Sequence, residues 1–449
     1  MSRFKPRELH AERLSTTDEK GNRVYLFPED VRGFYRRIRT TLFSFLVILY
    51  LVLPWTYFKG EQTLLLDIAN RRFVLFGHVF WGHDAPLLIF LFLGICFFIA
   101  LITAIWGRVW CGHACPQTVF LDLIYRRIEI LVEGKVRDRI LLEEGSMNMN
   151  KLFKRTVKWI LYFLVSAIIA HSFIGYFVGT KNLWSIVTHN PEQNWTIFTM
   201  TFLLTAIFAF DFGWFREQFC IIACPYGRFQ SVLMDQDSYH VTYDNTRNDC
   251  INCFRCVAVC PTGIDIRRGT QMECIGCTQC IDACDEIMLK VQKPIRLIRY
   301  ETENGLKKLK TKIIRPRTII YSVALCAVMI GFFLTVKSKE NMFTLWIRNT
   351  TPYTVNTQGS EKIITNQFKL ELFHHEVTNV YFKVNNKEVH LVTPTTPFQL
   401  KDKRKETAII FFQFPQNILK NGSHRIKVDL YSDKDLLKED EVELVGPIN

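Results

Sequence analysis

The cysteine-rich stretch CINCFRCVAVCP, from Cys250 to Pro261, is followed by CIGCTQCIDAC, from Cys274 to Cys284. The first run has the C-x2-C-x2-C-x3-C-P spacing with which bacterial ferredoxins hold 4Fe-4S clusters, and the second repeats it with Asp285 in place of the proline. In such paired runs the fourth cysteine of each run binds the cluster of the other. We therefore predict two clusters, with the ligand sets Cys250, Cys253, Cys256 and Cys284, and Cys274, Cys277, Cys280 and Cys260.

The chemistry of this doubled run favours iron-sulfur clusters over zinc. Thiolates are soft ligands, and small residues such as Gly263 and Gly276 let the backbone wrap closely, so that its amides reach the sulfur atoms. Zinc sites usually use two separated C-x2-C pairs rather than this pattern. Two neighbouring clusters conduct single electrons, and nothing in the run itself indicates an organic substrate.

The composition places this module in a large membrane protein. The chain has 449 residues, of which 49% are hydrophobic and 14% aromatic, enough for two or three domains. Twelve of its fourteen cysteines fall into tight clusters, which indicates metal ligands rather than a disulfide scaffold. The net charge of +13 comes mostly from Lys and Arg beside apolar segments, so it reports membrane orientation, and nucleic acid is not an expected partner.

Five apolar segments are long enough to span about 30 Å of hydrocarbon as helices. They cover residues 41–58, 85–106, 159–178, 195–214 and 318–336. Tryptophans near several of their ends fit an interfacial belt, namely Trp55, Trp106, Trp159, Trp195 and Trp214. The first segment follows a charged stretch of about forty residues, so it is expected to remain as an anchor rather than to be cleaved as a signal peptide.

Basic residues in the flanks set the expected orientation, because Lys and Arg are retained on the cytoplasmic side. RRIRT (Arg36 to Thr40) precedes the first segment, and KKLKTKIIRPR (Lys307 to Arg317) precedes the fifth. KLFKRTVK lies between the second and the third. We expect a protein of the bacterial inner membrane whose N-terminus and residues 215–317 are cytoplasmic and whose tail is periplasmic.

Two further cysteine pairs lie at the expected cytoplasmic ends of the second and fourth segments. WCGHACPQTVF contains Cys111 and Cys115, and FCIIACPYGRF contains Cys220 and Cys224. We interpret the two units as an internal repeat of helical hairpins, which would bring the four thiols together around an approximate two-fold axis. The proline after each pair is expected to begin a new helix, whose N-terminal amides would lower the pKa of the thiols.

Three roles fit these four thiols. They could bind Cu(I), which prefers soft sulfur, with help from His113. They could hold another metal centre, either iron-sulfur or zinc, or they could be structural cysteines whose reactivity is unused. The duplication and the neighbouring electron carrier favour a metal, but from the residues alone all three roles stay open.

Other polar residues in the spans are candidates for structure more than for function. Cys96 and Cys326 are expected to be small packing residues. Asp211 is expected to pair with Arg216. Three histidines could ligate haem or contact a quinone, namely His78, His83 and His171. Haem is not favoured, because no two of them form a matched pair at the same depth in the membrane.

The tail from about Phe343 to Asn449 changes to short runs of β-branched and aromatic residues. FTLWIRN, KLELF, NVYFKV, AIIFFQF and HRIKVDLY alternate with turn-forming Asn, Gly, Pro and Thr. We predict an immunoglobulin-like β-sandwich of about a hundred residues, without the usual disulfide because the tail contains no cysteine. His374 and His375 are expected to be surface residues rather than metal ligands.

The predicted fold class is a multi-domain membrane protein with a five-helix transmembrane bundle, an α+β bacterial-type ferredoxin module and a C-terminal β-sandwich. The expected domains are a cytoplasmic segment 1–40, two helical hairpins 41–214 with a cytoplasmic loop 107–158, the ferredoxin domain 215–317, a fifth transmembrane helix 318–336 and the periplasmic domain 337–449. The function has to come from the cysteines, because the tail shows no catalytic constellation.

This combination of five spans, two C-x3-C-P motifs, a doubled ferredoxin run and a β-rich tail resembles the cytochrome c oxidase accessory proteins of the CcoG/RdxA/FixG family over almost the whole chain. Membrane ferredoxins of nitrate and nitrous oxide respiration share the cysteine motifs but lack this tail. The resemblance implies a role in assembling cbb3-type cytochrome oxidase, in which Cu(II) is reduced to Cu(I) for delivery. It implies two 4Fe-4S clusters as cofactors, and copper as a substrate or transient ligand at the catalytic cysteines Cys111, Cys115, Cys220 and Cys224.

The implied partners are membrane lipid, and oxidase assembly factors or a copper transporter or chaperone. The electron donor is unknown, and a homodimer is a further expectation. Two other functions stay open. The chain could be an electron-transfer subunit of a quinone-linked respiratory complex, or a scaffold that recruits oxidase subunits through its β domain without reducing copper.

Overall fold

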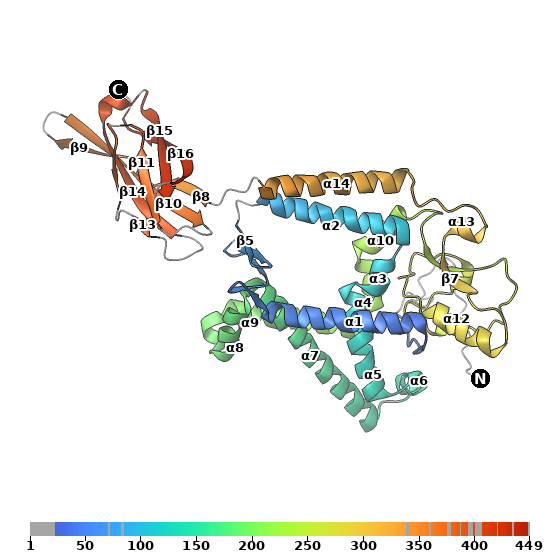
Figure 1. The fold of residues 1–449 in the computed structure, drawn as a ribbon. Coiled ribbons are helices and arrows are strands. Elements are labelled where there is room, and N and C mark those ends of the chain that lie inside the picture. Colours follow the sequence, from blue (N-terminus) through green and yellow to red (C-terminus); the bar gives the residue numbers. More distant parts are fainter. Residues whose placement is uncertain are drawn as a thin grey trace. The chain divides into compact units, whose positions relative to one another are not determined.

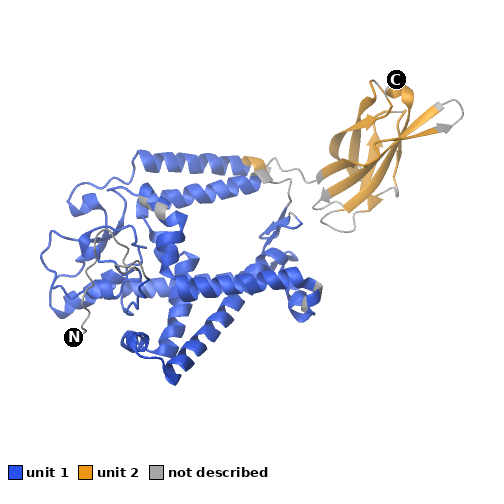
Figure 2. Ribbon diagram, turned by 180° about the vertical axis from the view of Figure 1, so that it is seen from behind, with its two compact units in different colours: residues 1–333 blue, residues 334–449 orange. Residues whose placement is uncertain are grey.

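The computed structural model describes residues 23–70, 72–81, 85–337, 342–358, 361–374, 379–386, 388–393, 398–399, 406–419, 421–432 and 435–447. Residues 1–22 of the predicted cytoplasmic segment, His83 and His375 lie outside this range. The chain divides into two units, Met1–Phe333 and Leu334–Asn449 (Figure 2). The division falls inside the fifth span helix, a few residues before the predicted start of the tail.

Five helices among the described residues are long and apolar enough to cross a membrane, as predicted (Figure 1). They cover Phe34–Trp55, Leu87–Trp106, Met149–Val178, Trp195–Phe215 and Pro316–Val336. Two of them begin a full turn or more earlier than predicted, at Phe34 instead of Thr41 and at Met149 instead of Trp159. The apolar pattern stops at the basic residues, but Lys and Arg are good helix formers, so both helices extend beyond the apolar stretch.

The first unit is mainly helical up to the ferredoxin module. Its helices are α1 (Phe34–Val52), α2 (Ala85–Trp106), α3 (Val109–His113), α4 (Pro116–Phe120), α5 (Arg126–Glu133), α6 (Val136–Glu144), α7 (Met149–Val178), α8 (Thr180–Thr188), α9 (Trp195–Phe210) and α10 (Pro225–Leu233). Three π-helical turns accompany them, at Leu121–Tyr125, Asp211–Phe215 and Phe219–Ala223. Short strands that the sequence did not predict lie between α1 and α2, with β1 (Tyr57–Phe58) paired to β2 (Glu61–Gln62) and a sheet of β3 (Leu64–Asp67), β4 (Arg72–Leu75) and β5 (His78–Trp81).

The spans pair differently from the predicted repeat of two hairpins. α7 packs against α9, as a hairpin requires, but α1 packs against α7 and α4. α2 lies beside α14 (Pro316–Lys337) (Figure 1 and Figure 2). This contact is close, because a Cβ at Gly331 would lie 2.8 Å from the ring of Phe90. The sequence repeat is therefore not matched by equivalent helix packing, since the fifth span offers α2 an apolar partner of its own.

The ferredoxin module surrounds a small core. Its elements are β6 (His240–Tyr243), α11 (Arg255–Ala258), α12 (Gln279–Lys290), β7 (Ile298–Glu301) and α13 (Glu303–Leu306). β6 and β7 pair antiparallel. Val241, Ile281 and Ile298 from three of these elements are buried together. The core thus joins β6 to α12, the helix that contains the last two cysteines of the second run.

Helix α1 begins on this module. Its first amides, from Tyr35 and Arg36, donate to the carboxylate of Asp282 in α12 at 3.2 and 2.7 Å. A carboxylate at a helix N-terminus satisfies amides that have no partner within the helix. Asp282 lies between Cys280 and Cys284, so the helix that carries two predicted cluster ligands also caps the first span.

The second unit consists of two antiparallel β-sheets, with strand orders β12-β14-β10-β8, where β9 pairs with β10, and β13-β11-β15-β16. The strands are β8 (Met342–Arg348), β9 (Thr354–Gln358), β10 (Glu361–His374), β11 (Asn379–Val384), β12 (His390–Val392), β13 (Phe398–Gln399), β14 (Glu406–Pro415), β15 (Ser423–Ser432) and β16 (Asp435–Val445). Both sheets contribute to one core, in which Phe412 of β14 and Val428 of β15 are fully buried. The β-rich tail is confirmed, and its immunoglobulin-like identity stays a prediction.

Candidate functional site

The two ferredoxin cysteine runs adopt the same backbone shape at matched positions. Asn252 and Gly276, each two residues after the first cysteine of a run, have left-handed φ angles of 54° and 67°. Phe254 and Thr278, each after the second cysteine, have φ angles of 56° and 60°. Left-handed turns direct backbone amides toward a common point, and the amide of Asn252 reaches Sγ of Cys250 at 3.4 Å. The doubled motif is therefore a doubled local structure.

The long-range placement of the cysteines agrees with an exchange of the fourth ligand between runs. Burial and neighbouring charges, including those of Cys253 and Cys250, raise the pKa of Cys284 to about 11. Burial raises the pKa of Cys274 to about 12, and the charge of Cys260 adds to the effect. Each run thus has the last cysteine of the other run close to its own, while the ligand assignment itself stays a prediction.

A small cavity between these loops is lined by five of the cysteines, Cys256, Cys260, Cys274, Cys277 and Cys280. Within the described residues, no three His, Cys, Asp or Glu side chains stand close enough to bind a single metal ion. Cluster ligands are more widely spaced, because each thiolate binds a different iron. Converging soft thiols and inward backbone amides fit 4Fe-4S clusters, which when bound supply transfer of single electrons.

The four cysteines of the C-x3-C-P motifs form a second group. Pro116 and Pro225 begin α4 and α10, which confirms the predicted helix starts. Burial raises the pKa of Cys220, and the next largest causes are the charges of Cys115 and Cys111 from the other motif. The structure therefore brings the two motifs together, although they are about a hundred residues apart in the chain.

Burial raises the pKa values of Cys111, Cys115 and Cys220 rather than lowering them. The pKa of Cys111 rises to about 12, and that of Cys115 also rises. Backbone amides at Gln117 and Thr118, in the first turn of α4, do lower the pKa of Cys115, but the loss of water around the thiol outweighs them. The prediction of lowered pKa values was wrong for Cys111, Cys115 and Cys220, because their thiols are largely removed from water.

The first motif packs directly against the loop of the second predicted cluster. A Cβ at Gly112 would collide with the carbonyl of Gly276, and a Cβ at Gly276 would lie 3.0 Å from the carbonyl of Arg108. Only residues without a side chain allow two backbones to approach so closely. Gly112 follows Cys111 and Gly276 precedes Cys277, so the two cysteine-rich regions are in contact.

Arg108 connects three segments at this contact. Its guanidinium donates to the carbonyl oxygens of Met272 and Cys274 in the cluster loop, the latter at 3.3 Å. It also donates to the carbonyl of Gly227 in α10, the helix that follows the second motif. Arg108 is only 9% exposed. One buried side chain thus ties both C-x3-C-P motifs to the ferredoxin module.

Polar side chains of α2 and α10 orient Cys111. Its Sγ donates to Oε1 of Gln230 at 3.0 Å, and the amide of Gln230 donates to Oγ1 of Thr103 at 3.4 Å. Both Gln230 and Thr103 are fully buried. A buried hydrogen-bond chain of this kind holds its members in one arrangement, so the orientation of the thiol depends on both helices.

His113 lies between the cysteines of the first motif, in surroundings that favour the neutral form of its imidazole. Burial and the nearby positive charge of Arg39 lower its pKa. Its Nδ1 lies 3.2 Å from the carbonyl of Val109, one turn earlier in α3. Neutral imidazole is the form that binds metal ions, so His113 stays a candidate ligand.

A buried ionic network supports the first motif. Arg39 of α1 donates to the carbonyl of Gly112 at 2.7 Å and lies 3.3 Å from Asp122. Asp122, in the π-helical turn after α4, also pairs with Arg36 and Arg126. Burial alone would raise the pKa of Asp122, but the three arginine charges outweigh it and lower the pKa to about 2. The first span is thereby anchored to the helix after the motif.

Arg216 belongs to a second buried pair and not to Asp211. Its guanidinium pairs with Glu129 of α5, which also lies 3.1 Å from Arg139. Asp211 and Arg216 meet through backbone groups, with the amide of Arg216 donating to the carbonyl of Asp211. The prediction of an Asp211 and Arg216 pair was wrong, because the left-handed turn at Arg216, with φ of 54°, directs its side chain toward α5.

The remaining candidates from the sequence lie elsewhere. Cys96 of α2 and Cys326 of α14 are exposed on their span helices, and their role as small apolar packing residues stays a prediction. The Nδ1 atom of His171 lies 2.7 Å from the carbonyl of Ala167 in its own helix. His78 is the first residue of β5, and we place none of these side chains in the candidate site.

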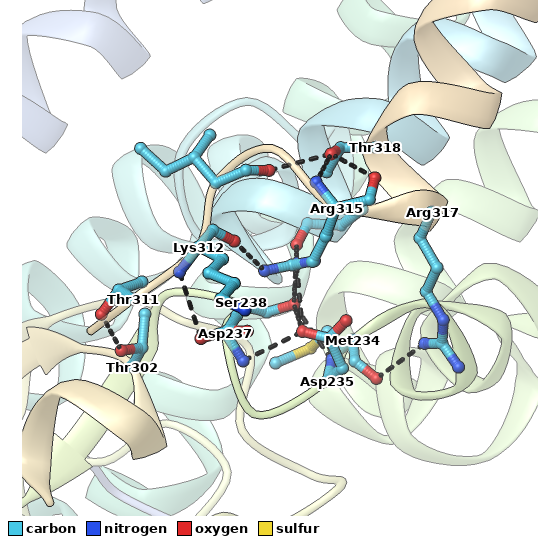
Figure 3. A network of polar contacts seen from close by, with 12 residues as sticks. Met234, Asp235, Asp237, Ser238, Thr302, Thr311, Lys312, Arg315, Arg317 and Thr318 are labelled. Carbon is cyan, nitrogen blue, oxygen red and sulfur yellow. Dashed lines mark hydrogen bonds and ion pairs between the residues drawn. The ribbon is translucent and has the colours of Figure 1, made fainter. Parts of the chain in front are cut away.

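A polar network fixes the start of α14 to the ferredoxin module (Figure 3). Arg315, directly before α14, pairs with Asp235 at 3.0 Å and donates to Oγ of Ser238 at 3.0 Å. Ser238 in turn donates to the carbonyl of Ala104 near the end of α2 at 2.6 Å. Arg315 therefore joins α14, α2 and the segment before β6, which holds the module at the ends of these two helices.

Comparison with known proteins places both cysteine regions in one family. A family model described as a 4Fe-4S dicluster domain matches residues 215–249 and 244–303, and one described as a 4Fe-4S binding domain matches residues 87–137. Protein RdxA of Cereibacter sphaeroides is 35% identical over an alignment of 334 residues, and the match covers 67% of this chain and 69% of that protein. The chain belongs to the RdxA/FixG family.

Two further relatives support this assignment. Protein RdxB of the same organism is 36% identical over an alignment of 342 residues, and the match covers 68% of this chain and 70% of RdxB. Nitrogen fixation protein FixG of Rhizobium meliloti is 33% identical over an alignment of 323 residues, and the match covers 66% of this chain and 61% of FixG. No solved structure matches. The resemblance expected from the sequence is confirmed, and the chain is an iron-sulfur electron-transfer protein of the RdxA, RdxB and FixG type.

Sequence reasoning identified the cysteines of this RdxA/FixG protein and missed the side chains that join them. Arg108 and Arg39 look like ordinary cytoplasmic flanking charges, and Gln230 lies in a short helix whose polar residues are usually exposed. The position of Arg108 in the sequence could have identified it, since it lies only three residues before Cys111. A buried arginine next to a metal-binding motif is a candidate for bridging between loops.

Proposed function

We propose that this chain reduces Cu(II) to Cu(I) for the assembly of a cbb3-type cytochrome c oxidase. The observation that carries the proposal is the backbone contact between Gly112 of the first motif and Gly276 of the cluster loop. Each Cu(II) ion takes up one electron at or near the four thiols, and Cu(I) is the product. Soft sulfur favours this product, because thiolates bind Cu(I) better than harder ligands do.

The surrounding residues have distinct roles in this proposal. Cys111, Cys115, Cys220 and Cys224 receive the copper ion, with His113 beside them. No three of these described side chains stand within reach of a single metal ion, so in this proposal the thiols close around the copper as it binds. Arg108 keeps the receiving site against the cluster loop, which shortens the path of the electron. Gln230 orients the thiol of Cys111 through its hydrogen bond of 3.0 Å.

The test is a single turnover of the full-length protein in detergent. Both clusters are reduced with dithionite, excess reductant is removed, and Cu(II) is added with a chelator that reports Cu(I) by its colour. We expect about two Cu(I) ions per chain, one for each electron stored in the two clusters. A double variant, Cys111→Ala with Cys115→Ala, is expected to keep its iron and to lose most of the copper binding and reduction.

The matched control changes Cys96 and Cys326 to alanine. Both are exposed on span helices, so this control removes the same number of thiols away from the site. It is expected to behave like the unmodified protein. The proposal fails if reduced protein with intact clusters forms no Cu(I), or if copper binding survives unchanged in the Cys111 and Cys115 variant.

The proposal extends to the cell. We place the protein in a bacterial inner membrane, with the N-terminus and residues 215–317 cytoplasmic and the tail periplasmic, and oxidase assembly factors or a copper transporter or chaperone as partners. A homodimer is part of the same proposal. The tail, as an immunoglobulin-like domain, offers oxidase subunits a docking surface. Deletion of residues 343–449 is expected to stop oxidase assembly while copper reduction by the purified protein survives.

A further inference from the structure

An apolar cavity lies among the span helices of the first unit. Its volume is about 680 Å³, within the range of small-molecule sites. Leu46 of α1, Phe120 of α4, Ile169 of α7 and Phe208 of α9 are among the residues that line it. A ligand in this cavity therefore needs a largely apolar body.

One carboxyl group lines this cavity without satisfying its hydrogen-bonding capacity. Oδ1 of Asp211 is buried and has no hydrogen-bond partner among the described residues. Asp211 begins a π-helical turn, a distortion that is frequent at functional sites. Gln117 lines the same cavity and donates from its amide to the carbonyl of Arg216 at 3.2 Å. An ionisable residue in a membrane span is costly to bury and commonly serves a ligand or a proton path.

The cavity also reaches both C-x3-C-P motifs. Ala114 and Pro116, on either side of Cys115, line it, and so does Ala223, which precedes Cys224. The first of these motifs packs against the cluster loop through Gly112. A redox-active ligand in the cavity would thus lie beside the cysteine site and a short distance from the ferredoxin module.

We propose that this cavity binds a membrane quinone and that quinone reduction is a further activity of the chain. The apolar walls suit the ring and the first part of an isoprenoid tail, and Asp211 and Gln117 are the polar groups for a quinone oxygen. A lipid acyl chain would suit the walls equally but would leave Oδ1 of Asp211 without a hydrogen-bond partner. The proposal rests on the iron-sulfur character of the family and not on copper reduction.

The reaction is a two-electron, two-proton reduction. The quinone gains two electrons and two protons and leaves as the quinol. Asp211, in its acid form, donates one proton to a quinone oxygen and is reprotonated from water, and water supplies the second proton. The electrons arrive one at a time from the reduced iron-sulfur protein, whose two predicted clusters store the number that one quinone needs.

The first experiment measures binding in the full-length, oxidised protein. A photoreactive short-chain azidoquinone is crosslinked and the labelled peptides are identified by mass spectrometry. We expect labelling in α9 and in the π-helical turn that Asp211 begins. Leu46→Trp, which fills the cavity from α1, is expected to abolish most of this labelling without loss of iron.

The second experiment measures electron transfer. Protein reduced with dithionite, and freed of excess reductant, is mixed without oxygen with a short-chain ubiquinone, and the reoxidation of the protein and the formation of quinol are followed. Asp211→Asn is expected to slow reoxidation by about a hundredfold, the typical contribution of a positioned proton donor. Asp211→Glu is expected to recover part of the rate.

Two controls separate the proton step from damage to the protein. Ferricyanide takes up electrons without protons, so it is expected to oxidise all variants at the same rate. Asp67→Asn makes the same change in β3, outside the cavity lining, and is expected to leave both rates unchanged. Reoxidation of Asp211→Asn by quinone at the unmodified rate, or azidoquinone labelling confined to other helices, would overturn the proposal. So would a phospholipid retained by the purified protein at the cavity with no labelling by quinone. None of these results depends on whether copper is reduced.

Discussion

The ferredoxin module and the group of Cys111, Cys115, Cys220 and Cys224, here called the membrane-end site, each contain cysteines from a duplicated motif. The two regions are built in different ways. In the module, the repeated sequence repeats the backbone, as the left-handed turns at Asn252 and Gly276 show. At the membrane end, the first motif presents Gly112 to the cluster loop, whereas the second begins in a π-helical turn at Phe219–Ala223. One site follows from local turns, and the other from contacts between distant segments.

This difference decides which changes each site tolerates. The module sets its ligand geometry within two short loops, so the loss of one cysteine acts directly on the cofactor. The membrane-end site depends on α1, α2, α5 and α10 together, so changes at residues outside its motif are expected to matter almost as much as changes at its cysteines. The difference can be tested residue by residue.

The largest expected effect is the loss of a cluster from the module. Cys256→Ser and Cys277→Ser each remove one buried thiol, and hydroxyl oxygen is a harder and poorer ligand for the iron. Each variant is expected to lose about half of its iron and acid-labile sulfide, since one of two clusters is affected. Iron analysis and electron paramagnetic resonance of the reduced protein measure the loss.

Cys111→Ser provides the comparison from the other region. It is expected to keep both clusters and their resonance spectrum, because its thiol belongs to the membrane-end site. An equal loss of iron from this variant would show that the match of residues 87–137 to a 4Fe-4S binding domain reports an iron-sulfur ligand at Cys111. The copper proposal would then be wrong for that cysteine.

The second effect is a loss of stability when Asp122 is neutralised. Asp122→Asn leaves the buried side chains of Arg36, Arg39 and Arg126 without their shared carboxylate. Breaking a buried ion pair by removing one partner costs about 3–5 kcal/mol. Glu143→Gln, which breaks the more exposed pair with Arg155, is expected to cost at most about 1 kcal/mol. Unfolding followed by tryptophan fluorescence in detergent compares the two variants.

The stability difference between the unmodified protein and Asp122→Asn is expected to depend on pH. The pKa of Asp122 is lowered from 3.8 to about 2, so its pairing stabilises the fold at pH values above 3.8. As the pH falls from 3.8 toward 2, the unfolded chain takes up the proton first and this contribution is lost. The stability difference between the unmodified protein and Asp122→Asn is therefore expected to narrow below about pH 4. A difference that is constant from pH 7 to pH 3 would contradict the assignment.

The sequence predicted the part of the molecule that local rules control. Cysteine spacing indicated the clusters, hydropathy indicated the five spans, and Pro116 and Pro225 marked two helix starts. It could not predict the pairing of Arg216 with Glu129, because that choice depends on a left-handed turn and on the position of α5. It also missed the packing of α2 beside α14, since an apolar helix carries little information about which apolar partner it meets.

The third prediction concerns the bridge between the two regions. Arg108→Ala removes hydrogen bonds to three backbone carbonyls, and unsatisfied buried acceptors cost about 1–3 kcal/mol. Arg108→Lys is expected to restore little, because one ammonium group lacks the planar fork that reaches separate carbonyls. Both variants are expected to keep their iron and to transfer electrons to copper more slowly in a single turnover.

Arg317→Ala is the control for that bridge. Arg317 also donates to backbone carbonyls, those of Val232 and Met234, but from an exposed position. It is expected to have little effect on stability or on electron transfer. If Arg108→Ala transferred electrons at the unmodified rate, the contact at Gly112 would be a packing contact only, and the two cysteine regions would work independently.

The smallest expected effect is at the hydrogen bond between Cys111 and Gln230. Gln230→Leu removes the acceptor at 3.0 Å, a loss of about 1 kcal/mol, which corresponds to about a fivefold change in an equilibrium. The freed thiol is expected to react a few times faster with an alkylating reagent, as measured by mass spectrometry of the peptide that contains Cys111. Gln62→Leu is the matched control, because Gln62 is equally buried but bonds to backbone carbonyls of Leu64 and Gly175. Faster alkylation of Cys111 in both variants would indicate that the helices have loosened generally. Faster alkylation in Gln230→Leu alone would show that a residue outside the motif controls a cysteine inside it. At the ferredoxin runs, we expect no side chain outside the loops to control a cysteine in this way, because backbone amides within the loops bond to the sulfur atoms, as the amide of Asn252 does to Cys250.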